Sequence, residues 1–265
     1  MALVAQIGES VTNGLAYLGS LATLGVRASY YTFVGPFRGK PLRLQRAISQ
    51  AMDVGVRALP ILSLITFFIG LILALQGAYE LRKFGAIDLV ATAVAVSMTR
   101  ELGPLITAIV VIGRSGSAFA AEIGTMKVTE EIDALETMAI SPVHFLVTPK
   151  FLAMIIMLPC LTIWANTMGI LGGSLFGVLQ ADFTLNRYIR ASVDSLFMRD
   201  ITTGLIKSVM FGITITAVGC FEGLATGAGA EQVGRSTTRA VVMSIFLVVV
   251  VDLLFTGLFF FVSGE

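Results

Sequence analysis

Histidine and cysteine are nearly absent from this sequence, which has one histidine and two cysteines in 265 residues. A lone histidine, His144, supports no metal site, because such sites draw on several protein ligands. Cys160 and Cys220 both lie in apolar runs, so no disulfide framework is expected. Charged residues are also scarce, at 13% against about 25% in soluble domains. Together these shortages argue against a metal-centred, disulfide-stapled or ordinary soluble protein.

Motifs for catalysis and nucleotide binding are missing as well. The run GRSG at 113–116 lacks the GxxxxGK[ST] pattern and a preceding strand, so it is not a phosphate loop. No convergent His/Asp or Ser/His set supports a membrane-embedded enzyme such as an acyltransferase. The net charge of +1 argues against nucleic acid as a partner. The N-terminus has neither the early basic region nor the cleavage site of a signal peptide, so we expect it to be retained.

Hydrophobic residues, in contrast, make up 56% of the chain, and its mean hydropathy is +0.89. This predicts an all-α polytopic membrane protein with a single membrane domain over 58–265. About 20 apolar residues suffice for a span, and the gaps between charges predict five. The predicted spans cover about 58–79, 100–121, 151–180, 201–221 and 240–261.

Two of these runs need further comment. The uncharged stretch from 89 is about 33 residues long, roughly 50 Å as one helix. We therefore expect a short periplasmic-side segment over 89–99, followed by a span from about 100. In the third run, Pro159 predicts a bend.

Lysine and arginine predict the orientation, because they concentrate on the cytoplasmic side. With the N-terminus inside, ten fall on the cytoplasmic side: Arg27, Arg38, Lys40, Arg43, Arg46, Arg57, Lys127, Lys150, Arg235 and Arg239. Five then fall outside: Arg82, Lys83, Arg187, Arg190 and Arg199. This bias predicts a cytoplasmic N-terminus and an external C-terminus.

Residues 1–57 are predicted to form amphipathic helices at the membrane surface. One apolar stripe, in 4–24, consists of Val4, Ile7, Val11, Leu15, Leu18 and Leu21. A second stripe, in 41–57, consists of Leu42, Leu44, Ile48 and Met52, and it lies opposite Arg43, Arg46 and Gln50. Neither stretch is apolar enough to span, so anchoring and packing are the expected roles.

The segment between the second and third spans contains a short acidic helix. Its carboxylates are Glu130, Glu131, Asp133 and Glu136, and Ile132, Leu135 and Met138 recur at helical spacing to form one apolar face. Thr129 is the expected N-cap, and Ser141-Pro142 the expected end. The stripe suits a partner protein, although it could instead rest on the membrane or on the rest of the subunit.

Charges within the spans are costly unless paired or hydrated. Arg100 and Glu101 begin the second span and Lys207 lies about two turns into the fourth, so the three are expected at one depth. They could line a lipid or solute cavity or form a buried structural ion pair. Asp252, near the middle of the fifth span, could relay protons or, more simply, join two helices.

Small residues spaced four apart form two ridges: Gly169, Gly173 and Gly177 in the third span, and Gly113, Ser117 and Ala121 in the second. Such ridges allow helix backbones to approach closely. They are compatible with packing inside the subunit and with a dimer seam.

Four segments closely resemble the MlaE (YrbE) permease family: RELGP at 100–104, GRSGSAFAAEIGTMKVTEEIDALETMAISP at 113–142, LIKSVMFGIT at 205–214 and TTRAVV at 237–242. The resemblance covers roughly residues 45–262. It implies a homodimeric inner-membrane permease, part of an MCE-associated ABC transporter that moves phospholipid between the inner membrane and the periplasm to maintain outer-membrane lipid asymmetry. The implied partners are a cytoplasmic ABC ATPase that binds ATP and magnesium, a small STAS-domain protein and a periplasmic hexamer of MCE subunits.

The resemblance also implies roles for two groups of residues. Residues 130–138 correspond to a coupling helix that docks on the ATPase, and Arg100, Glu101 and Lys207 fall where the family places polar residues near its lipid cavity. We therefore expect a permease that needs no cofactor of its own and is not an enzyme. The alternative is a stand-alone proton-coupled secondary transporter that uses Asp252 or Glu101 as its proton carrier.

Overall fold

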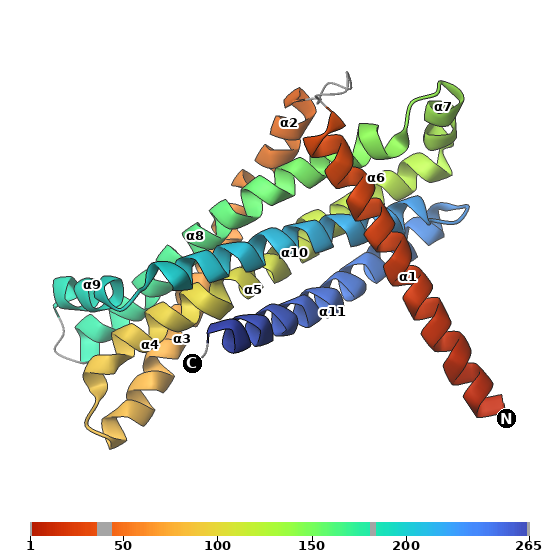
Figure 1. The fold of residues 1–265 in the computed structure, drawn as a ribbon. Helices are drawn as coiled ribbons and strands as arrows, with labels where there is room; N and C mark the ends of the chain where they lie inside the picture. The colour runs from red at the N-terminus through yellow and green to blue at the C-terminus, as the bar shows by residue number, and fades with distance from the viewer. Residues whose placement is uncertain (1, 36–43, 181–183, 264–265) are drawn as a thin grey trace. The chain divides into compact units, whose positions relative to one another are not determined.

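The computed structural model describes residues 2–35, 44–180 and 184–263, and these are almost entirely helical (Figure 1). The α-helices are α1 (Ala2–Phe33), α2 (Leu44–Val54), α3 (Leu59–Lys83), α4 (Val90–Ser97), α5 (Gly103–Val111), α6 (Ser117–Val128), α7 (Glu131–Thr137), α8 (Thr148–Gln180), α9 (Leu185–Asp194), α10 (Met198–Leu224) and α11 (Ala230–Ser263). π-Helical turns cover Met98–Leu102, Ile112–Gly116 and Val143–Val147. No strand occurs in these three ranges, and the predicted all-α class is confirmed.

Five helical stretches in the described part of the chain are long and apolar enough to cross a membrane, which confirms the predicted number. They are Leu44–Lys83, Ile87–Val128, Val143–Gly177, Met198–Leu224 and Ala230–Phe261. The first begins earlier than expected, because a short 3-10 turn over Val56–Ala58 joins α2 to α3 without a break. The third passes through Pro159, which lies inside α8.

The predicted segment over 89–99 and the predicted span from about 100 belong to one continuous helix. Ile87–Val128 is one helical stretch of 42 residues. Between the two parts, the chain makes the π-helical turn Met98–Leu102 and continues into α5. Pro104 has no N–H to donate to the preceding turn, and a π-helical turn can absorb such a defect while keeping the helix continuous.

The chain divides into two compact units, each built from three segments. The first unit comprises 1–50, 116–153 and 213–244, and the second comprises 51–115, 154–212 and 245–265. The second unit contains α3, α4, α5 and α9, and α3 and α4 lie side by side in it (Figure 1). Its core cluster consists of Ala74, Ala78, Val90, Val94, Met98 and Phe176.

The glycine ridge on α8 packs within this second unit. A Cβ on Gly70 of α3 would collide with the carbonyl oxygen of Gly169, so the two backbones touch directly. Further along, Gly173 and Gly177 lie against the Tyr188 side chain of α9, which is buried. The missing side chains therefore make room for α3 and α9, and this ridge serves packing within the subunit. At Gly113, on the other ridge, an added Cβ would meet nothing within 4 Å.

The two amphipathic stretches are helical, and their apolar stripes are largely exposed. On α2, Leu44, Ile48 and Met52 are all exposed, while Ala47 is buried. On α1, Leu15 and Leu18 are exposed and Leu21 is buried. The side chains of Val4, Ile7 and Val11, and the whole of Leu42 and Arg43, lie outside the described residues. Exposed apolar stripes on surface helices suit a membrane interface.

Candidate functional sites

A buried lysine is the centre of a polar cluster inside the second unit. Lys207 on α10 is 1% exposed, and its ammonium contacts Glu101 Oε2, Thr256 Oγ1 at 2.7 Å and Asp252 Oδ1 at 3.0 Å. Thr256 in turn donates its hydroxyl hydrogen to Glu101 Oε1 at 2.8 Å. An ammonium has three N–H donors, and here three oxygens surround it. The cluster thus joins groups from three spans.

Local helix geometry explains how these groups meet. Glu101 lies in the π-helical turn Met98–Leu102, and such turns recur at functional sites because they redirect side chains. Gly204 lies against the backbone of Thr99, where a Cβ would collide with its carbonyl oxygen. This close approach brings Lys207, one turn further along α10, to Glu101. Asp252 and Thr256 are four residues apart on α11 and therefore share a face.

The members of the cluster differ in their accessibility. Lys207 is the buried member, and loss of one of its partners would leave its charge uncompensated, so its contacts stabilise the fold. The side chain of Asp252 is 13% exposed, and that of Glu101 is 37% exposed. Glu101 is consequently the charged member that a molecule outside the helices can reach.

Arg100, predicted at the same depth, makes a different contact. Its Nε lies 3.5 Å from Asp200 Oδ1, and Asp200 Oδ2 accepts the backbone N–H of Phe197 at 3.1 Å. Asp200 is in the first turn of α10, where a carboxylate complements the positive end of the helix dipole. The structure therefore brings together Glu101, Lys207 and Asp252, while Arg100 belongs to an adjacent pair.

The acidic helix forms as α7, but both of its predicted ends are wrong. Thr129 caps the end of α6, and Glu130 precedes α7 in the left-handed conformation with φ 60°. The helix ends at Thr137, before Ser141, and Ala139 is also left-handed with φ 57°. The Thr129 hydroxyl donates to the carbonyl of Thr125, one turn back on α6, and Glu130 stands between Thr129 and α7.

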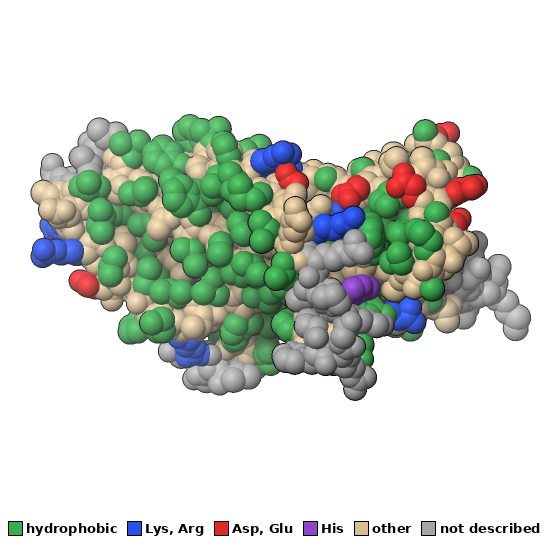
Figure 2. Space-filling model, turned by 90° about the horizontal axis from the view of Figure 1, so that it is seen from above, with side chains coloured by type: hydrophobic (Ala, Val, Ile, Leu, Met, Phe, Trp, Pro, Cys, Tyr) green, Lys and Arg blue, Asp and Glu red, His purple; other side chains and the backbone are tan. Residues whose placement is uncertain are grey.

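The apolar stripe of α7 mostly faces its own subunit. Ile132 and Leu135 are buried within the chain, whereas Met138 is exposed. The outward surface of α7 therefore consists mainly of the carboxylates Glu130, Glu131, Asp133 and Glu136. Asp133 Oδ1 pairs with Lys127 at 2.7 Å. Figure 2 shows acidic side chains gathered in the region where Figure 1 places α7.

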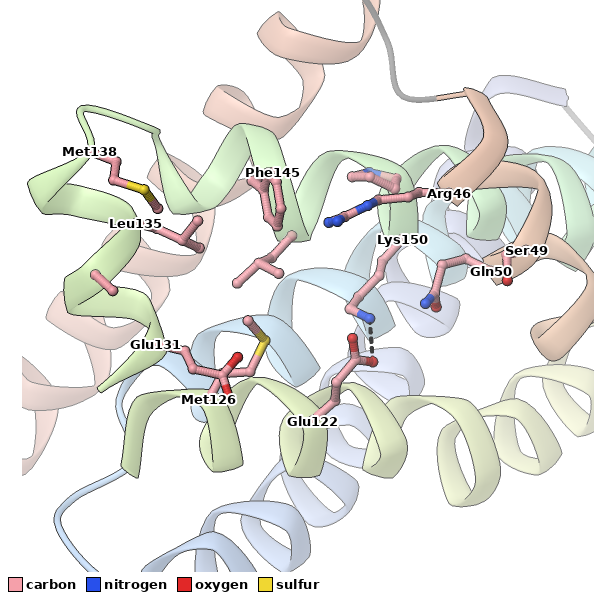
Figure 3. A pocket seen from close by; sticks show the side chains of 13 residues that line it. Arg46, Ser49, Gln50, Glu122, Met126, Glu131, Leu135, Met138, Phe145 and Lys150 are labelled. Atoms are coloured by element: carbon pink, nitrogen blue, oxygen red, sulfur yellow. Dashed lines mark hydrogen bonds and ion pairs between the residues drawn. The ribbon is translucent and has the colours of Figure 1, made fainter. Parts of the chain in front are cut away.

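A cavity of about 610 Å³ lies beside α7 within the first unit. Figure 3 shows Leu135 and Phe145 along its apolar part, with Arg46 at one side and Glu131 at the other. The Arg46 guanidinium stacks over the Phe145 ring at 4.0 Å. The cavity joins residues of α2, α6, α7 and α8, and its volume is in the range of small-molecule or side-chain pockets.

Two buried ionic contacts of the first unit were not foreseen. Lys150 is 2% exposed and its Nζ lies 2.5 Å from Glu122 Oε2. Glu222 is also buried, accepts the Tyr17 hydroxyl at 2.7 Å and lies 3.5 Å from Arg239 Nε. Burial, together with the hydrogen bond to Glu222, raises the pKa of Tyr17 above its ordinary value.

In residues 2–35, 44–180 and 184–263, no group of three or more His, Cys, Asp or Glu side chains could hold a metal ion. The only histidine, His144, contacts the Tyr31 ring at a centroid distance of 5.2 Å.

Five apolar helical stretches and a charged cluster buried among them define a multi-pass membrane protein. The family described as Permease MlaE matches residues 47–258. The chain belongs to the MlaE permease family.

Curated relatives agree with this assignment. An intermembrane phospholipid transport system permease protein, MlaE, of Haemophilus influenzae is 35% identical over 97% of each chain. A probable ABC transporter permease protein of Rickettsia prowazekii is 42% identical over 83% of this chain and 85% of its own. The chloroplast protein TRIGALACTOSYLDIACYLGLYCEROL 1 of Arabidopsis thaliana is 34% identical over 86% of this chain and 65% of its own. The relatives are permeases by name where a class is given, so this chain is a membrane permease rather than an enzyme.

Proposed function

We propose that this chain is the membrane subunit of an ATP-driven phospholipid transporter. It would move lipid between the inner membrane and the periplasm and so maintain the lipid asymmetry of the outer membrane. The observation that carries the proposal is the Glu101–Lys207–Asp252 cluster, which lies in three apolar spans of a chain whose relatives include an intermembrane phospholipid transport permease. Charges at membrane depth commonly mark a transport path.

The chain itself would bind lipid and change conformation, and the energy would come from a separate ABC ATPase. A ligand shifts a conformational equilibrium only by as much as it distinguishes the two states. ATP and magnesium would act on the ATPase, and this chain would need no cofactor. The remaining proposed partners are a second copy of this chain, a small STAS-domain protein and a periplasmic hexamer of MCE subunits.

The ATPase is proposed to dock on α7 from the cytoplasm, with the N-terminus of the chain inside and its C-terminus outside. Because Ile132 and Leu135 are buried in this chain, the contact would use the outward carboxylates and Met138. The neighbouring cavity could receive a side chain of the ATPase, since its apolar part is flanked by Arg46 and Glu131. An acidic surface predicts a basic receiving surface on the ATPase.

Reconstitution tests the transport proposal. The complex purified with its ATPase is placed in vesicles, and transfer of a fluorescent phospholipid is followed with and without ATP. Transfer that requires ATP and falls strongly in Glu101→Gln, without loss of assembly, is the expected result. If the isolated chain instead moves substrate in response to a proton gradient, the secondary-transporter alternative replaces this proposal.

Docking on α7 is tested separately by charge reversal. Glu136→Lys should release the ATPase during co-purification, because it places a cation on the acidic surface. Glu80→Lys is the matched control, since Glu80 is an exposed carboxylate on α3, paired with Lys83 at 3.0 Å. Equal retention of the ATPase by both variants would remove α7 from the interface.

A further inference from the structure

The buried position of Lys207 limits what it can recognise. Its ammonium donates to Glu101 and Thr256 and lies 3.0 Å from Asp252 Oδ1, and only 1% of the residue is exposed. A lipid phosphate would need at least one of those donors. Lys207 therefore serves to hold the carboxylates rather than to bind an anionic headgroup.

The reachable charge of the cluster is a carboxylate. Glu101 is 37% exposed, and each of its oxygens accepts one described hydrogen bond, Oε1 from Thr256 and Oε2 from Lys207. A carboxylate has about four lone-pair sites, so Glu101 retains acceptor capacity toward an approaching donor. The chemistry that matches it is a cation with N–H groups.

A second charge of opposite sign lies next to Glu101 in the chain. The Arg100 side chain is about half exposed and contacts Asp200 through Nε. Its terminal guanidinium nitrogens provide the fork of donors that suits phosphate oxygens. Arg100 and Glu101 are consecutive residues of one π-helical turn, and their described contacts lead to Asp200 and to the Lys207–Thr256 pair respectively.

From this arrangement we infer that the permease prefers phospholipids whose headgroup ends in a primary ammonium. The ammonium donates a charge-assisted hydrogen bond to Glu101 and the phosphate accepts from Arg100, while a headgroup ending in hydroxyls offers Glu101 only a weaker, neutral donor. The inference rests on the proposed function, because it presupposes that phospholipid reaches this cluster.

The test measures which lipids remain bound. The full chain, in complex with its ATPase, is equilibrated in mixed micelles that contain equal amounts of phosphatidylethanolamine and phosphatidylglycerol with identical acyl chains. Lipids retained after purification are quantified by mass spectrometry. The wild-type chain should enrich phosphatidylethanolamine roughly threefold or more over phosphatidylglycerol, as expected for a charge-assisted hydrogen bond at a partly exposed group.

Three variants separate the roles of the charges. Glu101→Gln should reduce the ratio to that of the micelle, and Glu80→Gln should keep the wild-type ratio, because Glu80 is an exposed carboxylate of α3 outside the cluster, paired with Lys83. Arg100→Gln should lower the amounts of both lipids and leave their ratio unchanged, because both carry the phosphate. Size-exclusion chromatography selects folded protein in each case.

Equal retention of the two lipids by the wild-type chain would overturn the inference, and so would an equal shift of the ratio in Glu101→Gln and Glu80→Gln. Displacement of the lipid by an equal concentration of free phosphoethanolamine would overturn the assignment to a lipid. ATP-driven transfer without headgroup preference would reject this inference alone. Failure to bind or transfer any phospholipid would reject the proposed function with it.

Discussion

The Tyr17 hydroxyl donates to Glu222 Oε1 at 2.7 Å and so ties α1 to a buried carboxylate of α10. The Tyr17 ring also meets Phe221 edge-on, with 5.2 Å between the ring centroids. Glu222 has a second, longer contact with Arg239 on α11. The amphipathic helix α1 is thereby fixed to the rest of the first unit by a polar contact as well as by packing.

This contact predicts a loss of stability at alkaline pH. The pKa of Tyr17 is raised in the folded chain above its ordinary value of 10.0, so the unfolded chain loses this proton first. Stability should be constant below about pH 10 and fall as the pH rises further. Thermal unfolding in detergent, followed between about pH 8 and about pH 11, measures it. Tyr17→Phe should be less stable than the wild type by about 1 kcal/mol near neutral pH, and its stability should fall less steeply at alkaline pH. If its stability falls as steeply as that of the wild type, groups other than Tyr17 cause the loss.

The Glu122–Lys150 pair should matter more than an exposed pair nearby. Glu122→Gln leaves the buried Lys150 ammonium without its carboxylate, and because Glu122 is itself about half exposed we expect a cost of about 1–3 kcal/mol. Asp133→Asn, which breaks the exposed contact with Lys127, should cost less than about 1 kcal/mol. Unfolding midpoints in one detergent compare the two variants. A larger loss in Asp133→Asn would contradict the importance of burial.

These buried pairs show why spans are easier to predict than polar contacts. Gaps between charges located all five spans, but a charge that bounds such a gap is assigned to the membrane surface. Lys150 directly precedes a predicted span and was counted among the cytoplasmic charges, although it is buried in the fold. A charge at a span end has no sequence pattern that distinguishes burial from solvation.

The intramembrane cluster was partly predictable for the opposite reason. Charges at Glu101, Lys207 and Asp252 lie within or at the start of apolar runs, where each needs a partner, so the sequence indicates that they are special. Thr256 could not be foreseen, because a threonine in a span is unremarkable. The helical spacing of the apolar residues in α7 could also be recognised in the sequence, whereas the surface that covers Ile132 and Leu135 depends on tertiary packing.

The left-handed residue after α7 predicts a stabilising substitution. Ala139 has φ 57°, a conformation that costs residues with a Cβ roughly 1–2 kcal/mol and costs glycine little. Ala139→Gly should therefore raise stability by about 0.5–1 kcal/mol after the loss of backbone entropy. Ala134→Gly, in the middle of α7, is the matched control and should lower stability by about 1 kcal/mol. Destabilisation by both variants would mean that Ala139 is not strained.

Two glycines of α3 offer a final comparison of packing with helix propensity. Gly70 lies against the backbone of Gly169, where an added Cβ would collide with a carbonyl oxygen that cannot move without shifting α8. Gly77 on the same helix has nothing within 4 Å of the added Cβ. Gly70→Ala should therefore cost about 1–3 kcal/mol, while Gly77→Ala should be neutral or slightly stabilising, because alanine is the better helix former. Unfolding midpoints of the two variants, measured in the same detergent, test the contact, and equal stability would show that α3 and α8 do not touch at Gly70.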